Sequence, residues 1–243
     1  MSSKPDRYFA SPLAHIPPFS FNAEVAEVFD DMVTRSVPLY RENQLLTVEI
    51  LSRVLRPRER VYDLGCSTGS ALVQIGTALK HLDLRLVGLD TSLPMVEKAR
   101  LKTRAFGLGD AVIEIADVTH HPLEAAGACV MNYTLQFIPT QLRGPFLKRI
   151  HAALRPGGVL LLAEKIRADE SSLQDLVNDV YYAFKRGNGY SELEISQKRE
   201  ALEDVLVPLG AREQTTLLHE AGFQEVETVL RWGPFATFLA VKR

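Results

Sequence analysis

Cysteine is almost absent from this sequence of 243 residues, which holds only Cys66 and Cys129. Two thiols cannot build the framework of disulfides that stabilises small secreted proteins. The first seven residues also lack the apolar segment of a secretory signal. We therefore expect a cytoplasmic protein whose thiols stay reduced.

Long hydrophobic runs and an excess of positive charge are absent as well. Residues 159–163 form one of the longest apolar runs, far short of the roughly 20 residues that span a bilayer. Lys and Arg total 28 against 30 Asp and Glu, which gives a formal charge of -2. Without a global positive field, we expect neither membrane insertion nor direct binding to nucleic acid.

Short apolar runs alternate with stretches of helical character over residues 51–166. Near-continuous apolar runs are typical of parallel strands that are buried on both faces. Apolar residues spaced three and four apart from Leu142 to Leu154 predict an amphipathic helix, with a turn at residues 156–158. This alternation predicts a doubly wound α/β sheet. The four runs lie at residues 61–64, 84–89, 128–133 and 159–163.

The pattern changes after Lys165 and predicts a pair of inserted helices. One helical face runs over residues 173–184 and ends at the turn-forming residues 187–189. Ser191 and Glu194 then have the spacing of a capping box that opens a second helix. We assign residues 167–212 to this helical insertion.

Both ends of the chain depart from the alternation. A helix near residues 213–221 precedes two β-rich runs, 225–232 and 235–241, which we expect to pair as an antiparallel hairpin at the sheet edge. Residues 8–21 contain three prolines and cannot form a continuous helix. We interpret them as a lid or docking arm, part of an N-terminal unit over residues 1–50, and we assign residues 51–243 to the cofactor-binding domain.

Residues 63–70, Asp-Leu-Gly-Cys-Ser-Thr-Gly-Ser, follow a predicted strand and lead into a helix. Gly65 and Gly69 allow a tight turn and a close approach to a ligand, although such turns also use glycine for purely structural reasons. Asp90 ends the next strand, where a carboxylate can accept both hydroxyls of a ribose. The sequence lacks the Gly-x-Gly-x-x-Gly and Gly-Lys-Ser/Thr phosphate motifs, which favours a ribose and adenine without phosphates.

Two further polar residues lie near the ends of predicted strands: Asp117 follows a strand-like run at residues 112–116, and Asn132 is the second-last residue of the run at 128–133. Asp117 can accept from the amino group of an adenine, or it can cap its own loop. Asn132 lies in an apolar run, where an amide without a partner costs about 1–3 kcal/mol, so a ligand or a loop backbone should bond to it. Because the carboxyl ends of parallel strands form the usual ligand crevice of an open α/β sheet, we expect these residues to converge there.

Residues 63–69 resemble the first motif of class I S-adenosylmethionine-dependent methyltransferases, except that Ser67 replaces the middle glycine. A more specific resemblance comes from the block at residues 184–199, Phe-Lys-Arg-Gly-Asn-Gly-Tyr-Ser-Glu-Leu-Glu-Ile-Ser-Gln-Lys-Arg. This block is similar to the carboxy-S-adenosyl-L-methionine synthase family, and the similarity runs from about residue 8 to the C-terminus. Residues 26–32, 35–40 and 132–137 carry it too.

The resemblance implies a Rossmann-like class I methyltransferase fold with a mostly parallel, seven-stranded sheet. It implies that S-adenosyl-L-methionine and prephenate are converted to carboxy-S-adenosyl-L-methionine and phenylpyruvate, without a metal. The product then serves a separate tRNA carboxymethyltransferase that modifies wobble hydroxyuridine, so this protein would act upstream and need not touch RNA. A homodimer is implied as well.

The resemblance also implies ligand contacts. Arg199, from the neighbouring subunit, would reach the carboxylate of the modified cofactor, and its guanidinium would distinguish this ligand from S-adenosylmethionine by sign. Thr91 and Val118 would contribute through their backbone. Tyr40 can instead be a packing aromatic, and Lys198 with Arg199 can be a solvated helix face. The implied cofactor-binding residues are Tyr40, Gly65, Cys66, Ser67, Asp90, Thr91, Asp117, Val118, Asn132 and Arg199, and no side chain is assigned as general base.

Two other functions compete with this one. An ordinary methyltransferase acting on a small molecule or RNA would form S-adenosylhomocysteine without prephenate. A non-catalytic module would bind the cofactor without turnover. Neither alternative requires the block that ends at Arg199.

Overall fold

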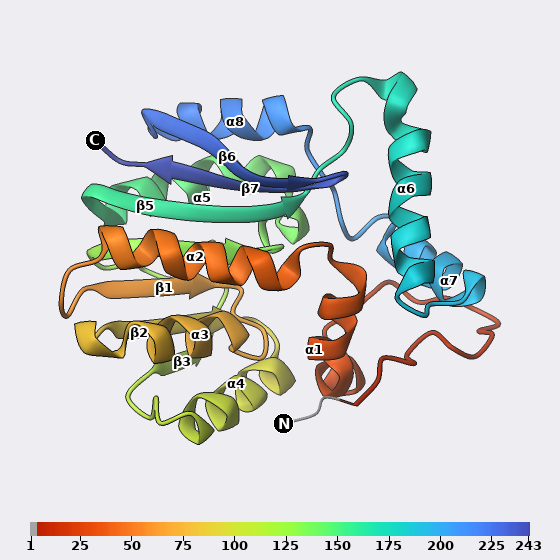
Figure 1. Ribbon diagram of the computed structural model, residues 1–243, viewed down its shortest axis with the longest axis horizontal. Coiled ribbons are helices and arrows are strands. Elements are labelled where there is room, and N and C mark those ends of the chain that lie inside the picture. The colour runs from red at the N-terminus through yellow and green to blue at the C-terminus, as the bar shows by residue number, and fades with distance from the viewer. Residues whose placement is uncertain (1–3) are drawn as a thin grey trace.

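The computed structural model describes residues 4–243 and centres on one seven-stranded sheet (Figure 1). The strand order is β3-β2-β1-β4-β5-β7-β6. The first five of these strands are parallel, while β7 runs antiparallel to both β5 and β6. The predicted fold class is therefore confirmed. The strands are β1 (Arg60–Leu64), β2 (Arg85–Asp90), β3 (Val112–Ile115), β4 (Ala126–Asn132), β5 (Leu154–Lys165), β6 (Glu225–Trp232) and β7 (Phe235–Val241).

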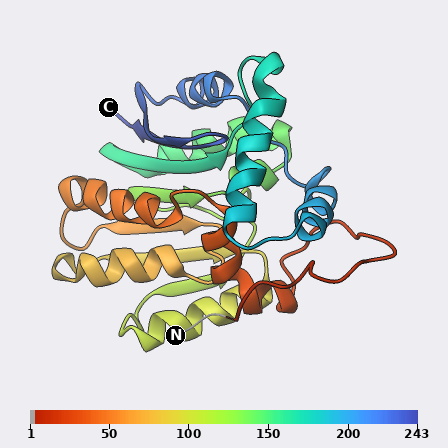
Figure 2. The same ribbon diagram turned by 45° about the vertical axis from the view of Figure 1, so that its right-hand side comes forward.

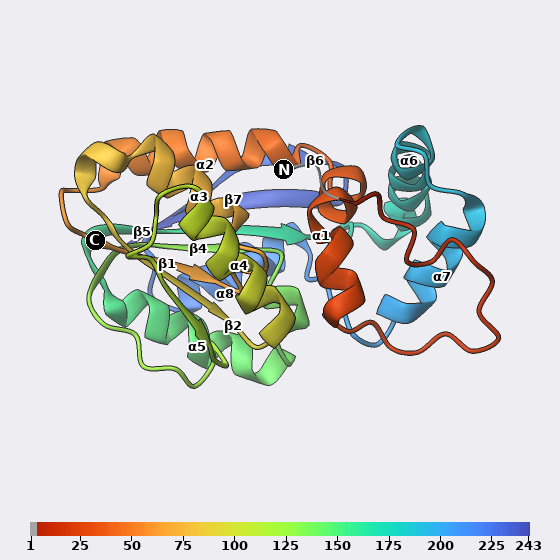
Figure 3. The same cartoon turned by 90° about the horizontal axis from the view of Figure 1, so that it is seen from below.

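Helices cover both faces of this sheet (Figure 3). The core on one face is closed by α2 (Tyr40–Val54), α3 (Ser70–Ala78) and α4 (Leu93–Ala105), and the core on the other by α5 (Thr140–Ala153) and α8 (Ala211–Glu220). Burial on both faces is the reason why β4 and β5 read as continuous apolar runs. Three short 3-10 helices complete the connections: η1 (Lys80–Leu82), η2 (Leu135–Phe137) and η3 (Ser171–Leu173).

The remaining helices stand beyond the carboxyl ends of the parallel strands. They are α1 (Ala23–Ser36), α6 (Gln174–Gly187) and α7 (Glu192–Leu202). The predicted insertion is present as α6 and α7, and the capping box of Ser191 and Glu194 opens α7 as expected. Within residues 4–243, no helix has the length and apolar content needed to cross a bilayer.

Two boundaries differ from the sequence interpretation. The turn predicted before the strand at residues 156–158 lies inside β5 instead, because β5 begins at Leu154, immediately after α5 ends, and its pairing with β4 passes from Leu154 directly to Val159. Gly157 has φ 73° and donates its N–H to the Lys242 carbonyl at 2.7 Å, so the C-terminus extends the pairing over these glycines. Residue 50, the predicted limit of the N-terminal unit, falls inside α2. The division into two domains stays a prediction.

The N-terminal arm lies against α7 without helical structure over residues 8–21 (Figure 2). The Gln197 side chain donates to the carbonyls of Phe9 and Ser11, both at 2.9 Å, and accepts from the N–H of Leu13 at 2.7 Å. Tyr190 donates its hydroxyl to the buried Asp6 carboxylate at 2.5 Å. Side chains of α7 and the turn before it thus hold the arm in place, and its function as a lid stays a prediction.

Candidate functional site

A cavity of about 570 Å³ opens at the carboxyl ends of the parallel strands and extends under α1, α6 and α7. Its volume is within the range of small-molecule sites. All ten residues predicted to bind the cofactor line this single cavity, from Asp117 beyond β3 to Arg199 on α7. The structure therefore brings the predicted set together, and the ligand contact of each residue stays a prediction.

The loop between β1 and α3 depends on three residues with positive φ. Gly65 has φ 84°, Ser67 47° and Gly69 78°. A Cβ added to Gly65 would lie 2.2 Å from Oγ1 of Thr134, so space as well as backbone conformation requires glycine there. Ser67 adopts the left-handed conformation that a middle glycine would take more easily, and its N–H donates to Oδ2 of Asp90 at 2.9 Å.

Two carboxylates border this loop. Asp90 accepts from the N–H of Ser67 on one oxygen and from the N–H of Ser92 on the other, both at 2.9 Å, and burial raises its pKa. Each oxygen keeps acceptor capacity for a hydroxyl. Asp63 is buried in the cavity wall, and its Oδ2 has no hydrogen-bond partner within residues 4–243. Burial, followed by the charge of Asp90, raises the pKa of Asp63 to about 7.

The sequence interpretation treated Asp63 only as part of the motif and did not name it as a site residue. Its position at the end of a strand was the signal that could have found it. An unpartnered, buried carboxylate oxygen at the cavity wall is suited to accept from a cationic group of a ligand.

Asp117 and Asn132 both have partners within the protein. Asp117 accepts from the N–H and the hydroxyl of Thr119, at 2.8 and 2.7 Å, so it caps its own loop. The Asn132 side-chain oxygen accepts from Nδ2 of Asn43 at 3.0 Å, and Asn43 in turn accepts from the Thr237 hydroxyl at 2.7 Å. The partner of Asn132 is therefore a buried amide on α2, and neither alternative weighed from the sequence had included it.

Aromatic rings form the wall next to Asn132. The Tyr40 and Tyr133 ring centroids lie 6.5 Å apart, and Tyr133, with φ 60°, also contacts Phe235 at 6.1 Å. Burial raises the pKa of both tyrosines, which keeps their hydroxyls protonated. The carboxylate of Glu164 accepts from two N–H groups of η2, at 2.9 Å each, and thereby fixes the segment that follows Tyr133.

Cationic side chains line the end of the cavity that lies opposite the β1–α3 loop. Arg199 is exposed and lines the cavity of its own chain, and its contribution from a neighbouring subunit stays a prediction. Lys198 is buried and donates to the Ser36 hydroxyl at 3.1 Å, so its interpretation as part of a solvated face is wrong. Lys165 and Lys185 also line the cavity. The sequence interpretation missed both, although Lys165 ends a strand, as the predicted polar residues do.

Neither cysteine has the character of a nucleophile. Cys66 and Cys129 are buried and free, and burial raises the pKa of both thiols, to about 12 for Cys129. Within residues 4–243, no three His, Cys, Asp or Glu side chains cluster as a metal site would require. The expectation of a metal-free enzyme stays a prediction.

Comparison with known proteins identifies the family. Residues 61–158 match the family described as a methyltransferase domain. The chain is 45% identical over 243 residues to the carboxy-S-adenosyl-L-methionine synthase of Desulfotalea psychrophila, covering 100% of this chain and 99% of the relative. The protein belongs to the carboxy-S-adenosyl-L-methionine synthase family. The synthase of Nautilia profundicola is 42% identical, over 98% of this chain and 99% of its own.

Solved structures support the fold of this synthase family member. The apo S-adenosylmethionine-dependent methyltransferase SibL aligns with a TM-score of 0.65 at 20% identity, covering 97% of this chain and 64% of its own. Human N-acetylserotonin methyltransferase, solved in complex with SAM, aligns with a TM-score of 0.60 at 16% identity, covering 90% of this chain and 55% of its own. At such identities the likeness concerns the fold alone. The synthase assignment, which the sequence resemblance predicted, is confirmed by the full-length relatives.

Proposed function

We propose that the protein converts S-adenosyl-L-methionine and prephenate to carboxy-S-adenosyl-L-methionine, phenylpyruvate and water. The observation that carries this proposal is one cavity with a loop suited to an adenosyl ligand at one end and a group of cationic side chains at the other. A methyltransferase that acts on a neutral acceptor would not require cationic side chains at the second end of its cavity. Prephenate carries two carboxylates, which such side chains can bind.

The proposed chemistry balances without a further reactant. The bond between the prephenate ring and its carboxyl group breaks and releases carbon dioxide, and the electron pair makes the ring aromatic as the hydroxyl group departs. That hydroxyl takes a proton from the sulfonium methyl and leaves as water. The ylide carbon then bonds to carbon dioxide. Prephenate itself thus supplies both the carboxyl group and the proton acceptor.

The protein contributes positioning and the exclusion of water. The Gly65 loop and Asp90 hold the adenosyl part, and the unpartnered oxygen of Asp63 is suited to the amino group of the methionine part. Helices α1, α6 and α7 border the cavity on the opposite side (Figure 2). Because an ylide and free carbon dioxide are both lost to water, an enclosed cavity favours their reaction with each other.

We also infer a cytoplasmic homodimer that supplies its product to a separate tRNA carboxymethyltransferase. Support for the dimer comes from α6 and the short helix η3 before it, where Leu173, Leu176 and Val180 are 49%, 62% and 48% exposed. Their spacing of three and four residues puts them on one face of the helix, with Leu173 in the preceding turn. An exposed apolar stripe on the helix that also carries the cavity residues Tyr181 and Lys185 suits a second copy that completes the site with Arg199.

Mass spectrometry after incubation with S-adenosylmethionine, with and without prephenate, tests the function. We expect the cofactor to gain one carboxyl group only when prephenate is present, together with phenylpyruvate. Formation of S-adenosylhomocysteine without prephenate would instead support an ordinary methyltransferase. Binding without any product would support a cofactor-binding module.

A further inference from the structure

Three buried or half-buried lysines from different elements line the end of the cavity that lies away from the β1–α3 loop. Lys165 ends β5, Lys185 lies on α6 and Lys198 on α7. Lys185 is 5% exposed and Lys198 8%. Among residues 4–243, no carboxylate lies within 4.0 Å of any of the three ammonium groups, whereas other lysines, such as Lys102, have such a partner.

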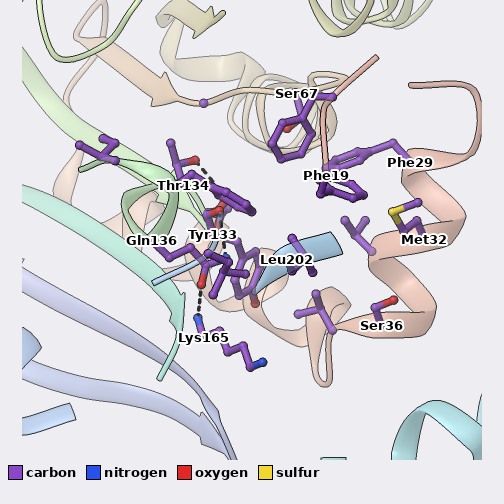
Figure 4. Close-up of a pocket in the computed structure, with 18 of the residues that line it drawn as sticks. Phe19, Phe29, Met32, Ser36, Ser67, Tyr133, Thr134, Gln136, Lys165 and Leu202 are labelled. Atoms are coloured by element: carbon purple, nitrogen blue, oxygen red, sulfur yellow. Dashed lines mark hydrogen bonds between the residues drawn. The ribbon is translucent and has the colours of Figure 1, made fainter. Parts of the chain in front are cut away.

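Two of the three lysines lie over the same aromatic ring, while Lys198 lies 5.7 Å from the centre of the Tyr190 ring. The Lys165 and Lys185 ammonium nitrogens lie 5.3 and 5.1 Å from the centre of the Tyr181 ring. The Tyr181 hydroxyl donates to the Ser36 carbonyl at 3.0 Å, and Lys198 donates to the hydroxyl of the same serine. Figure 4 shows the Lys165 side chain extending from β5 in the direction of α1, the helix that carries Ser36.

Without a ligand, the protonated forms of these three lysines are destabilised. Burial, then the charges of Lys198 and Lys165, lowers the pKa of Lys185 to about 7, and burial lowers the pKa of Lys198 to about 8. Lys198 has a neutral hydroxyl as partner, but Lys165 and Lys185 donate no side-chain hydrogen bond to residues 4–243. Buried cations are normally paired, so a pair left open to a cavity indicates an anionic ligand.

The sheet order separates this place from the adenosyl end. Gly65 and Asp90 stand at the ends of β1 and β2, on one side of β4, whereas Lys165 stands at the end of β5, on the other. Asn132, at the end of β4, lies between them. The lysines thus border the space left for a second substrate beside the cofactor.

We propose that Lys165 and Lys185 bind the carboxylate of the 2-oxo-acid side chain of the second substrate. This inference rests on the proposed function, in which that substrate is a dianion. Its ring carboxylate leaves as neutral carbon dioxide, and an ion pair with it would stabilise the ground state more than the transition state. The 2-oxo-acid carboxylate keeps its charge from substrate to product. Pairing it with the lysines anchors the molecule without opposing decarboxylation.

The test uses Lys165→Met and Lys185→Met in the full chain, with Lys148→Met, an exposed α5 lysine outside the cavity, as the matched control. Each cavity variant should raise the KM for prephenate about tenfold or more, as loss of a hydrogen bond to a charged group does. Inhibition by phenylpyruvate, which retains the 2-oxo acid, should weaken by a similar factor. Calorimetric binding of S-adenosylhomocysteine should be unchanged and verifies that each variant is folded.

The outcomes separate this inference from the function on which it rests. A wild-type protein that makes no carboxylated cofactor contradicts the function itself. An active wild-type protein together with an unchanged KM for prephenate in both cavity variants overturns the lysine assignment alone. A loss of prephenate affinity without a loss of phenylpyruvate inhibition also overturns it, since it would place the lysines on the carboxylate that departs.

Discussion

Gly65 is subject to two independent constraints, its positive φ and the 2.2 Å that would separate an added Cβ from the Thr134 side chain. Gly107 shares the first constraint, with φ 72°, but a Cβ there meets nothing within 4 Å. Alanine substitutions at the two positions therefore separate the effect of a left-handed backbone from that of a steric clash. Of the two glycines, only Gly65 lies in the cavity wall.

We predict that Gly65→Ala lowers the affinity for S-adenosylhomocysteine at least tenfold, because the loop must move away from Thr134. Gly107→Ala should cost about 1–2 kcal/mol of stability from its left-handed conformation and leave binding intact. Calorimetric titration and thermal unfolding measure the two effects. Equal affinities in both variants would show that the close approach at Gly65 is not needed for the ligand.

Protonation of the cavity lysines provides a second prediction at this scale. A dianionic substrate binds the ammonium form, so affinity is complete below the free-enzyme pKa and is lost as the pH rises above it. With a pKa of about 7 for Lys185, one of the two lysines proposed to bind the substrate, the KM for prephenate should rise above pH 7, by about fivefold from pH 7 to pH 8. The groups that face Lys185 and its neighbour Lys198 are Asp6, Arg35, Lys165, Tyr181 and Tyr190.

Steady-state kinetics at saturating S-adenosylmethionine measure this pH profile. Asp6 is the one acidic group among those that face Lys185 and Lys198, and it opposes the lowering of the pKa of both lysines. In Lys185→Met the rise should move to higher pH, because the substrate-binding group with a pKa of about 7 is gone. A KM that stays constant from pH 7 to pH 9 in the wild-type protein would show that the lysines do not bind the substrate in their charged form.

At the scale of elements, periodicity predicted the strands and the inserted helices because burial imposes it. β4 is buried along almost its whole length, and its apolar run marked it to within a few residues. The extent of β5 was missed because Gly157 and Gly158 suggest a turn, and only pairing with the C-terminus holds them in the sheet. Nothing local in the sequence encodes that pairing.

The site residues show the same contrast between features that the local sequence predicts and features that depend on long-range contacts. Asp90 and Asn132 could be predicted because strand ends of a parallel sheet meet at one edge. Lys185 could not, because its place in the cavity depends on how α6 stands over the strand ends, and its helix pattern reads equally well as a solvated face. The tertiary position of an insertion is set by long-range contacts that a single sequence does not display.

The apolar stripe of α6 leads to a prediction about assembly. Leu176→Glu should convert a dimer to a monomer, because a charge buried in an apolar interface has no partner. Leu101 on α4, which is 66% exposed, provides the matched control, and Leu101→Glu should leave assembly unchanged. Sedimentation velocity measures both. A wild-type monomer, or a Leu176→Glu dimer, would contradict the role of this helix.

At the scale of the whole molecule, the open question of which subunit supplies Arg199 has a direct test. In the structure, Arg199 lines the cavity of its own chain, whereas the family resemblance implies that it serves the neighbouring one. We expect Arg199→Ala and Gly65→Ala each to be inactive alone, the first through its missing guanidinium and the second through its distorted loop.

Mixing these two variants, after reversible dissociation, forms dimers that carry one of each chain. If Arg199 acts on the neighbouring subunit, the chain with the intact loop receives a guanidinium from its partner, and carboxylation of the cofactor is restored in part. If Arg199 acts within its own chain, every cavity in the mixture has one defect and activity stays absent. We predict that the mixture regains activity, measured as prephenate-dependent formation of carboxy-S-adenosyl-L-methionine. Adding Leu176→Glu to both chains should abolish this gain, because Arg199 can reach the neighbouring cavity only in the dimer.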